Sequence, residues 1–207
     1  MTARRPPSGA RRGQTPAQTI GPFFAPALLG HGREVGEVRV PDGARGTRIR
    51  IEGRVLDGAG EPVSDAMLEV WQANAHGRYD HPADTRGDAG LDDAVHGFAR
   101  LGTDAAGGFR FETVKPGPVP GRGNAWQAPH LNLLVFARGL LNHLSTRVYF
   151  DDEGAANAAD PVLRAVAPAR RGTLVAALDA ARPSPLPLVY RFDIRLQGAG
   201  ETVFLDF

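Results

Sequence analysis

The sequence predicts an all-β protein: a β-sandwich with long loops, a short helix and an extended N-terminal arm. Three observations support this fold class. Several short segments alternate polar and apolar residues with the period of a half-buried strand. The 207 residues include 26 glycines and 17 prolines, which suits many turns between short strands. Helical periodicity is almost absent, and about seven or more short strands with glycine-rich turns are typical of a β-sandwich.

The predicted strands share an alternating or apolar pattern that ends at turn residues. They cover residues 48–55, 66–72, 98–103, 109–113, 130–137, 147–150, 190–197 and 202–207. Segment 130–137 is nearly all apolar, which predicts a buried central strand. Asp160 followed by Pro161 is a good helix N-cap with proline in the first turn, and the pattern after it predicts only a short helix.

The N-terminal region differs from the rest of the chain. Residues 1–14 are rich in arginine, proline, glycine and serine, and we expect them to form a disordered leader. Segment 15–24 is more apolar and is punctuated by Gly21 and Pro22, so we expect an ordered arm that docks on another surface. Because no internal repeat and no second domain are apparent, residues 15–207 are predicted to form a single domain that includes this arm.

Composition excludes several classes of function. A net charge of +1 gives no electrostatic reason to expect nucleic acid or an anionic membrane as partner. The absence of cysteine removes disulfides, thiolate metal sites and cysteine nucleophiles. No apolar run approaches the roughly 18 residues of a membrane span, and the basic N-terminus lacks the apolar region of a signal peptide, so a cytoplasmic protein is expected. Phosphate-loop, dinucleotide, serine-hydrolase and zinc-protease motifs are missing as well.

His130 is the histidine with the most informative surroundings. It opens the apolar segment two residues before Asn132, and strand alternation places both side chains on one face. A second histidine at that position would complete a two-imidazole metal clamp, but an amide is a poor ligand for a ferric ion. From the residues alone, a hydrogen-bonded structural histidine is the favoured interpretation. Tyr79 is likewise interpreted as a loop tyrosine with a packed ring and a solvated hydroxyl.

Five segments resemble, in order along the chain, the intradiol ring-cleavage dioxygenases, and within that family the alpha chains of the protocatechuate 3,4-dioxygenases. They are LEVWQANAHGRY at 68–79, TVKPGPVP at 113–120, APHLNLLVFARG at 128–139, STRVYFDDE at 145–153 and YRFDIRLQGAGETVFLDF at 190–207. The resemblance runs from about Thr15 to the last residue. Its weight comes from the colinear order of the five segments rather than from any single motif.

The resemblance implies that the metal site of the family is incomplete in this chain. In the iron-bearing chains, two tyrosines and two histidines hold ferric iron. Tyr79 and His130 match one ligand of each kind, whereas Val119 and Asn132 stand at the other two ligand positions. Gln127 stands where the family has an arginine that assists the catalytic site. We therefore expect no bound metal and no catalytic residue in this chain alone.

The resemblance implies instead a non-iron-binding alpha subunit that completes the pocket around the iron of a beta subunit, in an alpha–beta oligomer. Thr19, Gly21 and Pro22 in the arm, together with Arg138, are the implied substrate-binding residues. A guanidinium near the pocket suits protocatechuate, because that substrate carries a carboxylate. A surface or interface salt bridge is the alternative role for Arg138.

The implied activity belongs to the complex. With Fe(III) bound by the beta subunit, it would cleave protocatechuate with dioxygen to 3-carboxy-cis,cis-muconate, in the β-ketoadipate route of aromatic catabolism. Two alternatives stay open. One is a single-chain intradiol dioxygenase with altered iron ligands. The other is a non-enzymatic β-sandwich binding module, because segment 53–72 by itself resembles the opening hairpin of many such modules.

Overall fold

A computed structural model describes residues 28–29, 37–38, 40, 42–86, 90–92, 94–182 and 187–206. The predicted leader, residues 1–14, and the predicted arm, residues 15–24, lie outside the described residues. Both therefore stay predictions, and so does the extent of the single domain.

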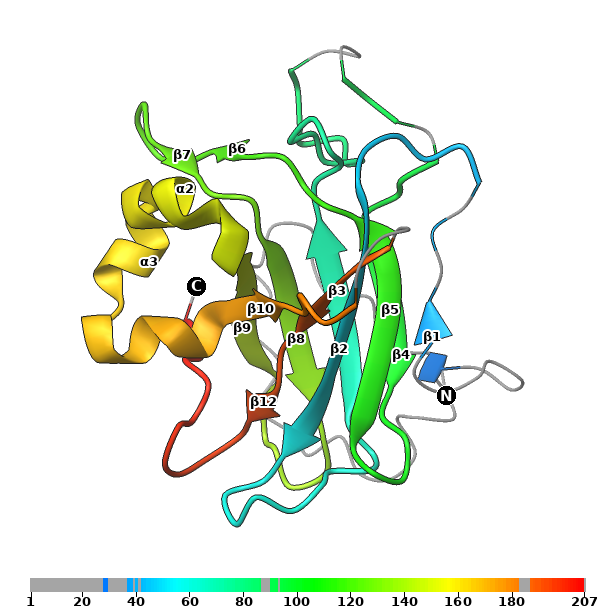
Figure 1. Ribbon diagram of the computed structural model, residues 1–207, viewed down its shortest axis with the longest axis vertical. Helices are drawn as coiled ribbons and strands as arrows, with labels where there is room; N and C mark the ends of the chain where they lie inside the picture. Colours follow the sequence, from blue (N-terminus) through cyan, green and yellow to red (C-terminus); the bar gives the residue numbers. More distant parts are fainter. Residues whose placement is uncertain are drawn as a thin grey trace, which may run out of the picture.

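Short strands dominate the described part of the chain (Figure 1), which confirms the predicted all-β class. The strands are β1 (Glu37–Val38), β2 (Arg48–Leu56), β3 (Met67–Gln72), β4 (Phe98–Gly102), β5 (Gly108–Val114), β6 (Val119–Pro120), β7 (Trp126–Gln127), β8 (Leu131–Phe136), β9 (Leu144–Phe150), β10 (Val175–Leu178), β11 (Leu188–Arg191) and β12 (Ile194–Arg195). The helical segments are η1 (Asp151–Glu153) and η2 (Pro168–Leu174), which are 3-10 helices, and the α-helices α2 (Gly154–Ala159) and α3 (Pro161–Ala165).

Most strands belong to one strongly curved sheet. Its order is β1-β5-β2-β11-β10-β9-β8-β3-β4, and β12 pairs with β2 off this path. The sheet folds back on itself, because β1 at one end contacts β4 at the other. β6 and β7 form a separate two-stranded hairpin. Two facing halves of sheet thus enclose a core, which is the sandwich arrangement that the sequence predicts.

The core fills the inside of this curved sheet. Strand alternation directs one set of side chains inward, and the buried set includes Ile49, Ile51, Leu68, Val70, Phe109, Phe111, Leu131, Leu133, Val135, Val148, Phe150 and Tyr190. Phe150 and Tyr190 meet edge to face with their ring centroids 5.0 Å apart. Burial of apolar surface contributes about 25 cal/mol per Å², so this continuous layer is the main stabilising feature of the domain.

The N-terminal and central strand predictions agree closely with the structure. Segments 48–55, 66–72, 98–103 and 109–113 correspond to β2, β3, β4 and β5. Segment 130–137 corresponds to β8, which lies between β3 and β9 and is therefore central, as predicted. Only one of its faces is fully buried, since alternate residues are half-buried. Asp160 caps α3 as predicted, because its carboxylate accepts hydrogen bonds from the backbone of Val162 and Leu163.

The C-terminal strand predictions need correction. Segment 190–197 is not one strand, because β11 and β12 are separated at Phe192 and Asp193. There the Asp193 side chain accepts the Arg54 N–H at 2.9 Å, and so replaces a backbone partner of the ladder. Residues 202–206 have no regular secondary structure. Their hydrogen bonds go to scattered partners instead, such as the one from Leu205 N–H to the Ser145 carbonyl.

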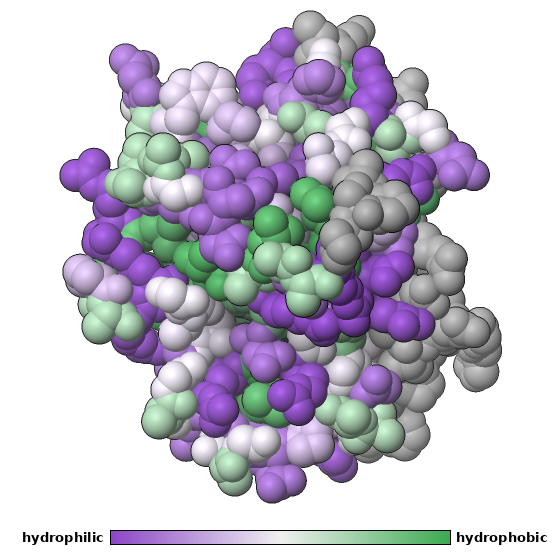
Figure 2. All heavy atoms as spheres, in the orientation of Figure 1, coloured by the Kyte–Doolittle hydropathy of each residue, from purple (hydrophilic) through white to green (hydrophobic). Residues whose placement is uncertain are grey.

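The helical region is larger than the single short helix that the sequence predicts. η1, α2, α3 and η2 follow one another between β9 and β10, and Figure 1 shows α2 and α3 gathered beside the β6–β7 hairpin. A second, smaller core of Ala128, Tyr149, Leu163 and Leu174 joins this region to the sheet. Each described helix falls short of the length and apolarity that a membrane crossing requires. Polar residues cover most of the face seen in Figure 2, with apolar residues showing in a strip across its middle.

Candidate functional site

A row of side chains crosses the outer face of the sheet where β3, β8 and β9 lie side by side. Trp71 is in register with Asn132, and Asn132 is in register with Arg147. Leu131 and Leu133, the neighbours of Asn132 along β8, belong to the main core. Because successive strand residues point to opposite faces, the row lies on the other side, toward the β6–β7 hairpin and the helical region.

His130 precedes this row and is held in one orientation. Its ring is 3% exposed and lies 5.7 Å from the Tyr149 ring, centroid to centroid. Nδ1 is 2.7 Å from the Ala128 carbonyl oxygen. A carbonyl can only accept, so Nδ1–H is the donor and Nε2 carries the lone pair. Burial, assisted by the positive charge of Arg147, lowers the pKa of His130 to about 4, so the imidazole is neutral at pH 7.

Arg147 brings a buried positive charge into the same region. Arg147 is 8% exposed. Nε donates to the Asn132 Oδ1 at 3.2 Å, and Nη1 donates to the Gln127 Oε1 at 2.7 Å. Nη1 also donates to the Tyr149 hydroxyl at 3.2 Å. We call Gln127, His130, Asn132, Arg147 and Tyr149 the polar cluster.

Tyr149 links the polar cluster to a buried carboxylate. Its hydroxyl accepts from Arg147 and donates to the Asp160 Oδ1 at 3.1 Å. Asp160 is 0% exposed; its Oδ2 accepts the Ala128 N–H at 2.8 Å, while its Oδ1 also accepts the two α3 amides. Burial is the main cause that raises the pKa of Tyr149, so the hydroxyl remains protonated. The helix cap, the turn before β8 and the Arg147 guanidinium are thereby held as one unit.

Tyr79 approaches the polar cluster from the loop after β3. Its ring stacks on Trp71 with centroids 5.8 Å apart and planes 14° apart. Burial raises the pKa of Tyr79, while a side-chain hydrogen bond with Asn132 and the charge of Arg147 act in the opposite direction. Asn132 donates from Nδ2 to the Trp71 carbonyl at 3.2 Å and accepts from Arg147, so it lies between the Trp71–Tyr79 stack and the guanidinium.

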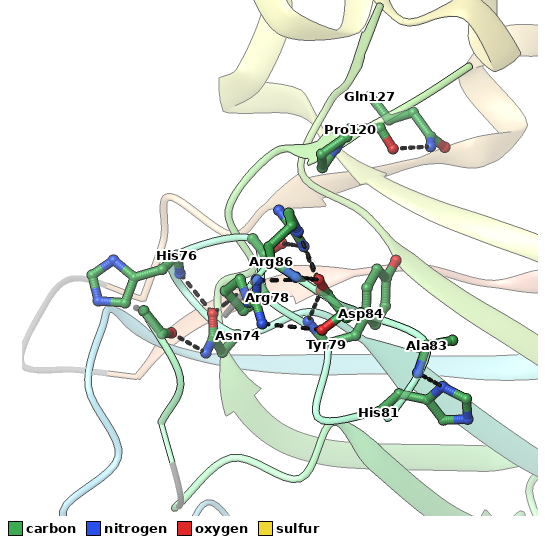
Figure 3. Close-up of polar contacts among 12 residues, drawn as sticks. Asn74, His76, Arg78, Tyr79, His81, Ala83, Asp84, Arg86, Pro120 and Gln127 are labelled. Carbon is green, nitrogen blue, oxygen red and sulfur yellow. Dashed lines mark hydrogen bonds and ion pairs between the residues drawn. The ribbon is translucent and has the colours of Figure 1, made fainter. Parts of the chain in front are cut away.

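The loop that carries Tyr79 is built around Asp84 (Figure 3). Asp84 accepts the Tyr79 N–H at 3.0 Å, Arg86 Nε at 2.7 Å, and lies 3.1 Å from Arg78 Nη1. Arg86 also donates from Nη2 to the Gly77 carbonyl at 2.6 Å. The hydrogen bonds from Arg86 hold the pKa of Asp84 well below its ordinary value. Two guanidinium groups on one carboxylate fix this loop against the sheet.

Val119 reaches the site through a close approach of two loops. Gly77 has a φ of +71°, and a Cβ there would lie 2.0 Å from the Pro118 carbonyl oxygen, so only glycine fits. Gly117 donates its N–H to the Asn74 carbonyl at 2.9 Å. These contacts seat Val119, which is 4% exposed, beside the Tyr79 loop.

An open cleft of about 500 Å³ lies over this site. Aromatic and apolar side chains from Trp71, Tyr79, Val119 and Pro120 form one part of its lining, and Asp84 and Arg86 contribute charged groups. The cleft is the size of a small-molecule site. Its two charged groups are already paired with each other, so they offer little net charge to a ligand.

The ligand atoms do not fit a ferric ion. The Tyr79 hydroxyl and His130 Nε2 are suitable donors, but Val119 offers only carbon and the Asn132 amide is engaged by Arg147. A guanidinium beside these groups would also repel a metal cation. Across the described ranges, no group of three or more His, Cys, Asp or Glu side chains could hold a metal ion. The part of the chain that the structure describes therefore offers no suitable site for the implied iron of the family.

The structure places Arg138 away from the polar cluster. Arg138 follows the C-terminal end of β8, whereas His130 precedes its first residue, and the six-residue strand spans about 20 Å. Arg138 Nε lies 2.9 Å from the Asp65 Oδ2, and its side chain is 72% exposed. Arg138 is thus available to a site outside this chain, although Asp65 already shares its charge. Thr19, Gly21 and Pro22 lie outside the described residues, so their substrate-binding role stays a prediction.

Sequence reasoning missed three residues of the site: Arg147, Tyr149 and Asp160 as its buried partner. A signal was present, because Arg147 and Tyr149 are polar residues that alternate with Val148 and Phe150 in the predicted strand 147–150. Their partners could not be named from this signal, since the pairing register of β8 and β9 is not visible in the sequence.

Comparison with known proteins places the chain in a family. A family model described as "Dioxygenase" matches residues 20–198. The protocatechuate 3,4-dioxygenase alpha chain of Burkholderia cepacia is 48% identical over 93% of this chain and 97% of its own length. The alpha chain of Pseudomonas putida is 43% identical over 94% and 96%. The beta chain of Burkholderia cepacia is 40% identical, over 76% of this chain and 67% of that protein.

Solved structures show the same fold. The 3-chlorocatechol 1,2-dioxygenase of Rhodococcus opacus aligns with a TM-score of 0.60 at 25% identity, covering 77% of this chain and 64% of that one. The dioxygenase domain of a carbohydrate-binding fusion protein from Streptomyces aligns with a TM-score of 0.56, over 90% of this chain and all of that domain. The matched family model spans well over half of the residues and the relatives match nearly end to end, so the chain belongs to the dioxygenase family.

Proposed function

We propose that this chain is the non-iron-binding alpha subunit of a protocatechuate 3,4-dioxygenase. In this role it assembles with an iron-bearing beta subunit in the cytoplasm and completes the pocket in which protocatechuate is cleaved with dioxygen. Two observations together support the proposal. The chain matches a protocatechuate 3,4-dioxygenase alpha chain over 97% of that protein, yet Val119 and Asn132 cannot ligate iron.

Arg138 supports a contribution to the partner's pocket. Its guanidinium is mostly exposed and lies far along β8 from the polar cluster, so it is free to face a neighbouring subunit. The substrate carboxylate would accept hydrogen bonds from this cation. Asp65 positions the side chain from the Nε edge and leaves the other nitrogens for the substrate. Thr19, Gly21 and Pro22 are proposed to line the same pocket from the arm.

The ferric iron supplied by the beta subunit would bind the catecholate and make it reactive toward dioxygen. The residues of this chain would bind the carboxylate, orient the ring and limit access of water. These roles fit a subunit in which the Arg147 guanidinium occupies the polar cluster and hydrogen bonds to Asn132 and Gln127.

Co-expression with its iron-bearing beta chain tests the proposal. We expect the two chains to elute together from a sizing column, and oxygen uptake with protocatechuate to require both. Each chain expressed alone is the control, and the product is identified as 3-carboxy-cis,cis-muconate by mass spectrometry. Failure of the chains to associate would contradict the proposal.

The single-chain alternative makes the opposite prediction. If this chain were an intradiol dioxygenase with altered iron ligands, the purified chain alone would contain iron and consume oxygen. The ligand atoms of the polar cluster argue against this, since an amide bound to a guanidinium is no ferric ligand. A non-enzymatic binding module has little support either, because the relatives named above are all dioxygenases.

A further inference from the structure

We propose that the Arg147 guanidinium is the resident cation of the polar cluster, and that it keeps metal ions out of the cluster even when metal ligands are present. The inference rests on the proposed function only for the two ligand positions that Val119 and Asn132 occupy. It assigns to Arg147 a role that the loss of ligands does not by itself explain.

Arg147 lies directly opposite Asn132 in the β8–β9 ladder, so the two side chains share one face of the sheet. The Asn132 Nδ2 also donates to the carbonyl of Trp71, whose ring stacks on Tyr79. A cation that contacts Asn132 is therefore close to the Trp71–Tyr79 pair.

Three neutral side chains surround the guanidinium. The guanidinium donates to the Asn132 amide, to the Gln127 amide and to the Tyr149 hydroxyl. All three acceptors are neutral oxygens gathered around one positive charge. Oxygen atoms arranged in this way also surround bound cations. Here the cation is the side chain of Arg147 itself.

The positive charge of the guanidinium already has a counterion inside the chain. The buried Asp160 lies on the far side of Tyr149, and its carboxylate balances the guanidinium through that hydroxyl. One cation already satisfies this cluster, and a metal ion would add a second cation to a poorly hydrated space.

Restoring the two lost ligands with and without Arg147 tests the inference on the isolated chain. The double variant Val119→Tyr/Asn132→His carries all four ligand types but keeps the guanidinium. The triple variant adds Arg147→Gln, which retains a hydrogen-bonding side chain without the charge. Each protein is mixed with ferrous ammonium sulfate in air and desalted. Bound iron is then measured by mass spectrometry and by a tyrosinate-to-iron absorption band in the visible range.

We expect the triple variant to bind iron and show the absorption band. The double variant should bind iron about 10- to 100-fold more weakly, which is the usual effect of residues that contact metal ligands without being ligands themselves. Adding Arg54→Gln to the double variant is the matched control, because Arg54 is an exposed arginine at the far end of β2. It should leave the weak iron binding of the double variant unchanged. Equal iron binding by the double and triple variants would overturn the inference, as would a folded triple variant that binds none.

Two further variants separate charge from shape and guard against misfolding. Arg147→Lys in the double variant keeps a positive charge and should still exclude iron; strong iron binding there would overturn the role of the charge. If Val119→Tyr prevents folding, Asn132→His/Arg147→Gln is compared with Asn132→His alone, using cobalt(II) as the probe. The variant lacking Arg147 should bind cobalt(II) more tightly, and equal affinities would overturn the inference. Failure of co-assembly with a beta chain would affect only the proposed function, because no partner enters these measurements.

Discussion

Asn132 and Arg147 face each other across β8 and β9, and the Arg147 Nε donates to the Asn132 amide oxygen at 3.2 Å. The Nδ2 of the same amide donates to the carbonyl of Trp71 at 3.2 Å, and the Trp71 ring stacks on Tyr79. The resemblance implies that the iron-bearing members of the family place a ligand histidine at the position of Asn132. The pair explains why the site keeps its shape without a metal, since each polar group has a partner inside the chain.

The isolated chain is expected to contain no stoichiometric iron and no visible tyrosinate band. The reason is that Val119 and Asn132 supply no ferric ligand, while Arg147 adds a positive charge beside Tyr79 and His130. Metal analysis of the chain purified from iron-supplemented cells checks this, with the beta chain prepared in parallel as the iron-bearing control. About one iron per isolated chain would show that the ligand assignment is wrong.

Arg138→Ala is expected to lower kcat/KM for protocatechuate in the assembled complex by roughly 10- to 150-fold, the equivalent of about 1.5–3 kcal/mol for a hydrogen bond to a charged group. The stability of the isolated chain should change little, because the Arg138–Asp65 pair is exposed. Arg164→Ala, which removes an exposed arginine from α3, is the matched control. Unchanged turnover with intact assembly would leave Arg138 as a surface salt bridge.

Asp84→Asn is expected to destabilise the domain by about 3 kcal/mol, because it leaves Arg78 as a buried guanidinium without its carboxylate. It should also loosen the loop that carries Tyr79, whose N–H loses a charged acceptor. Urea unfolding followed by circular dichroism measures the free energy. Asp80→Asn is the control, since Asp80 pairs with His96 at an exposed position. A similar loss in both variants would contradict the central role of Asp84.

The free energy of unfolding should fall as the pH drops from about 6.5 to about 4. His130 has a pKa of about 4 in the fold and 6.5 in the unfolded chain, so the unfolded state binds more protons across this window and stability rises with pH. The full effect is about 3 kcal/mol at most. Below about pH 4 the carboxylate of Asp84, whose pKa is lowered in the fold, adds a separate loss.

Urea unfolding at several pH values between 4.5 and 7 measures this slope. His130→Gln should flatten it, whatever its effect on absolute stability, because the titrating group is gone. His143→Gln removes an exposed histidine and serves as the control that keeps the slope. An unchanged slope in His130→Gln would place the proton uptake elsewhere.

The sequence by itself determined the fold class, most of the strands and the Asp160 helix cap. These depend on local patterns: alternation sets the buried face of β2 and β5, and an aspartate before a proline sets the start of α3. The family resemblance implied which ligands are missing, and a side chain such as Val119 has no ligand atom in any conformation. Local information was insufficient for the C-terminal region, where Asp193 interrupts the ladder and residues 202–206 bond to several different elements.

Only the tertiary structure decided what fills the site. Arg147 is 15 residues from Asn132 and 20 from Gln127 along the chain, and the β8–β9 register brings the three together. Likewise Asp160 reaches Tyr149 only because the helical region folds over the outer face of the sheet. The physical reason is that a charge is stable in the interior only with specific partners, and those partners are chosen by strand register and packing rather than by sequence neighbours.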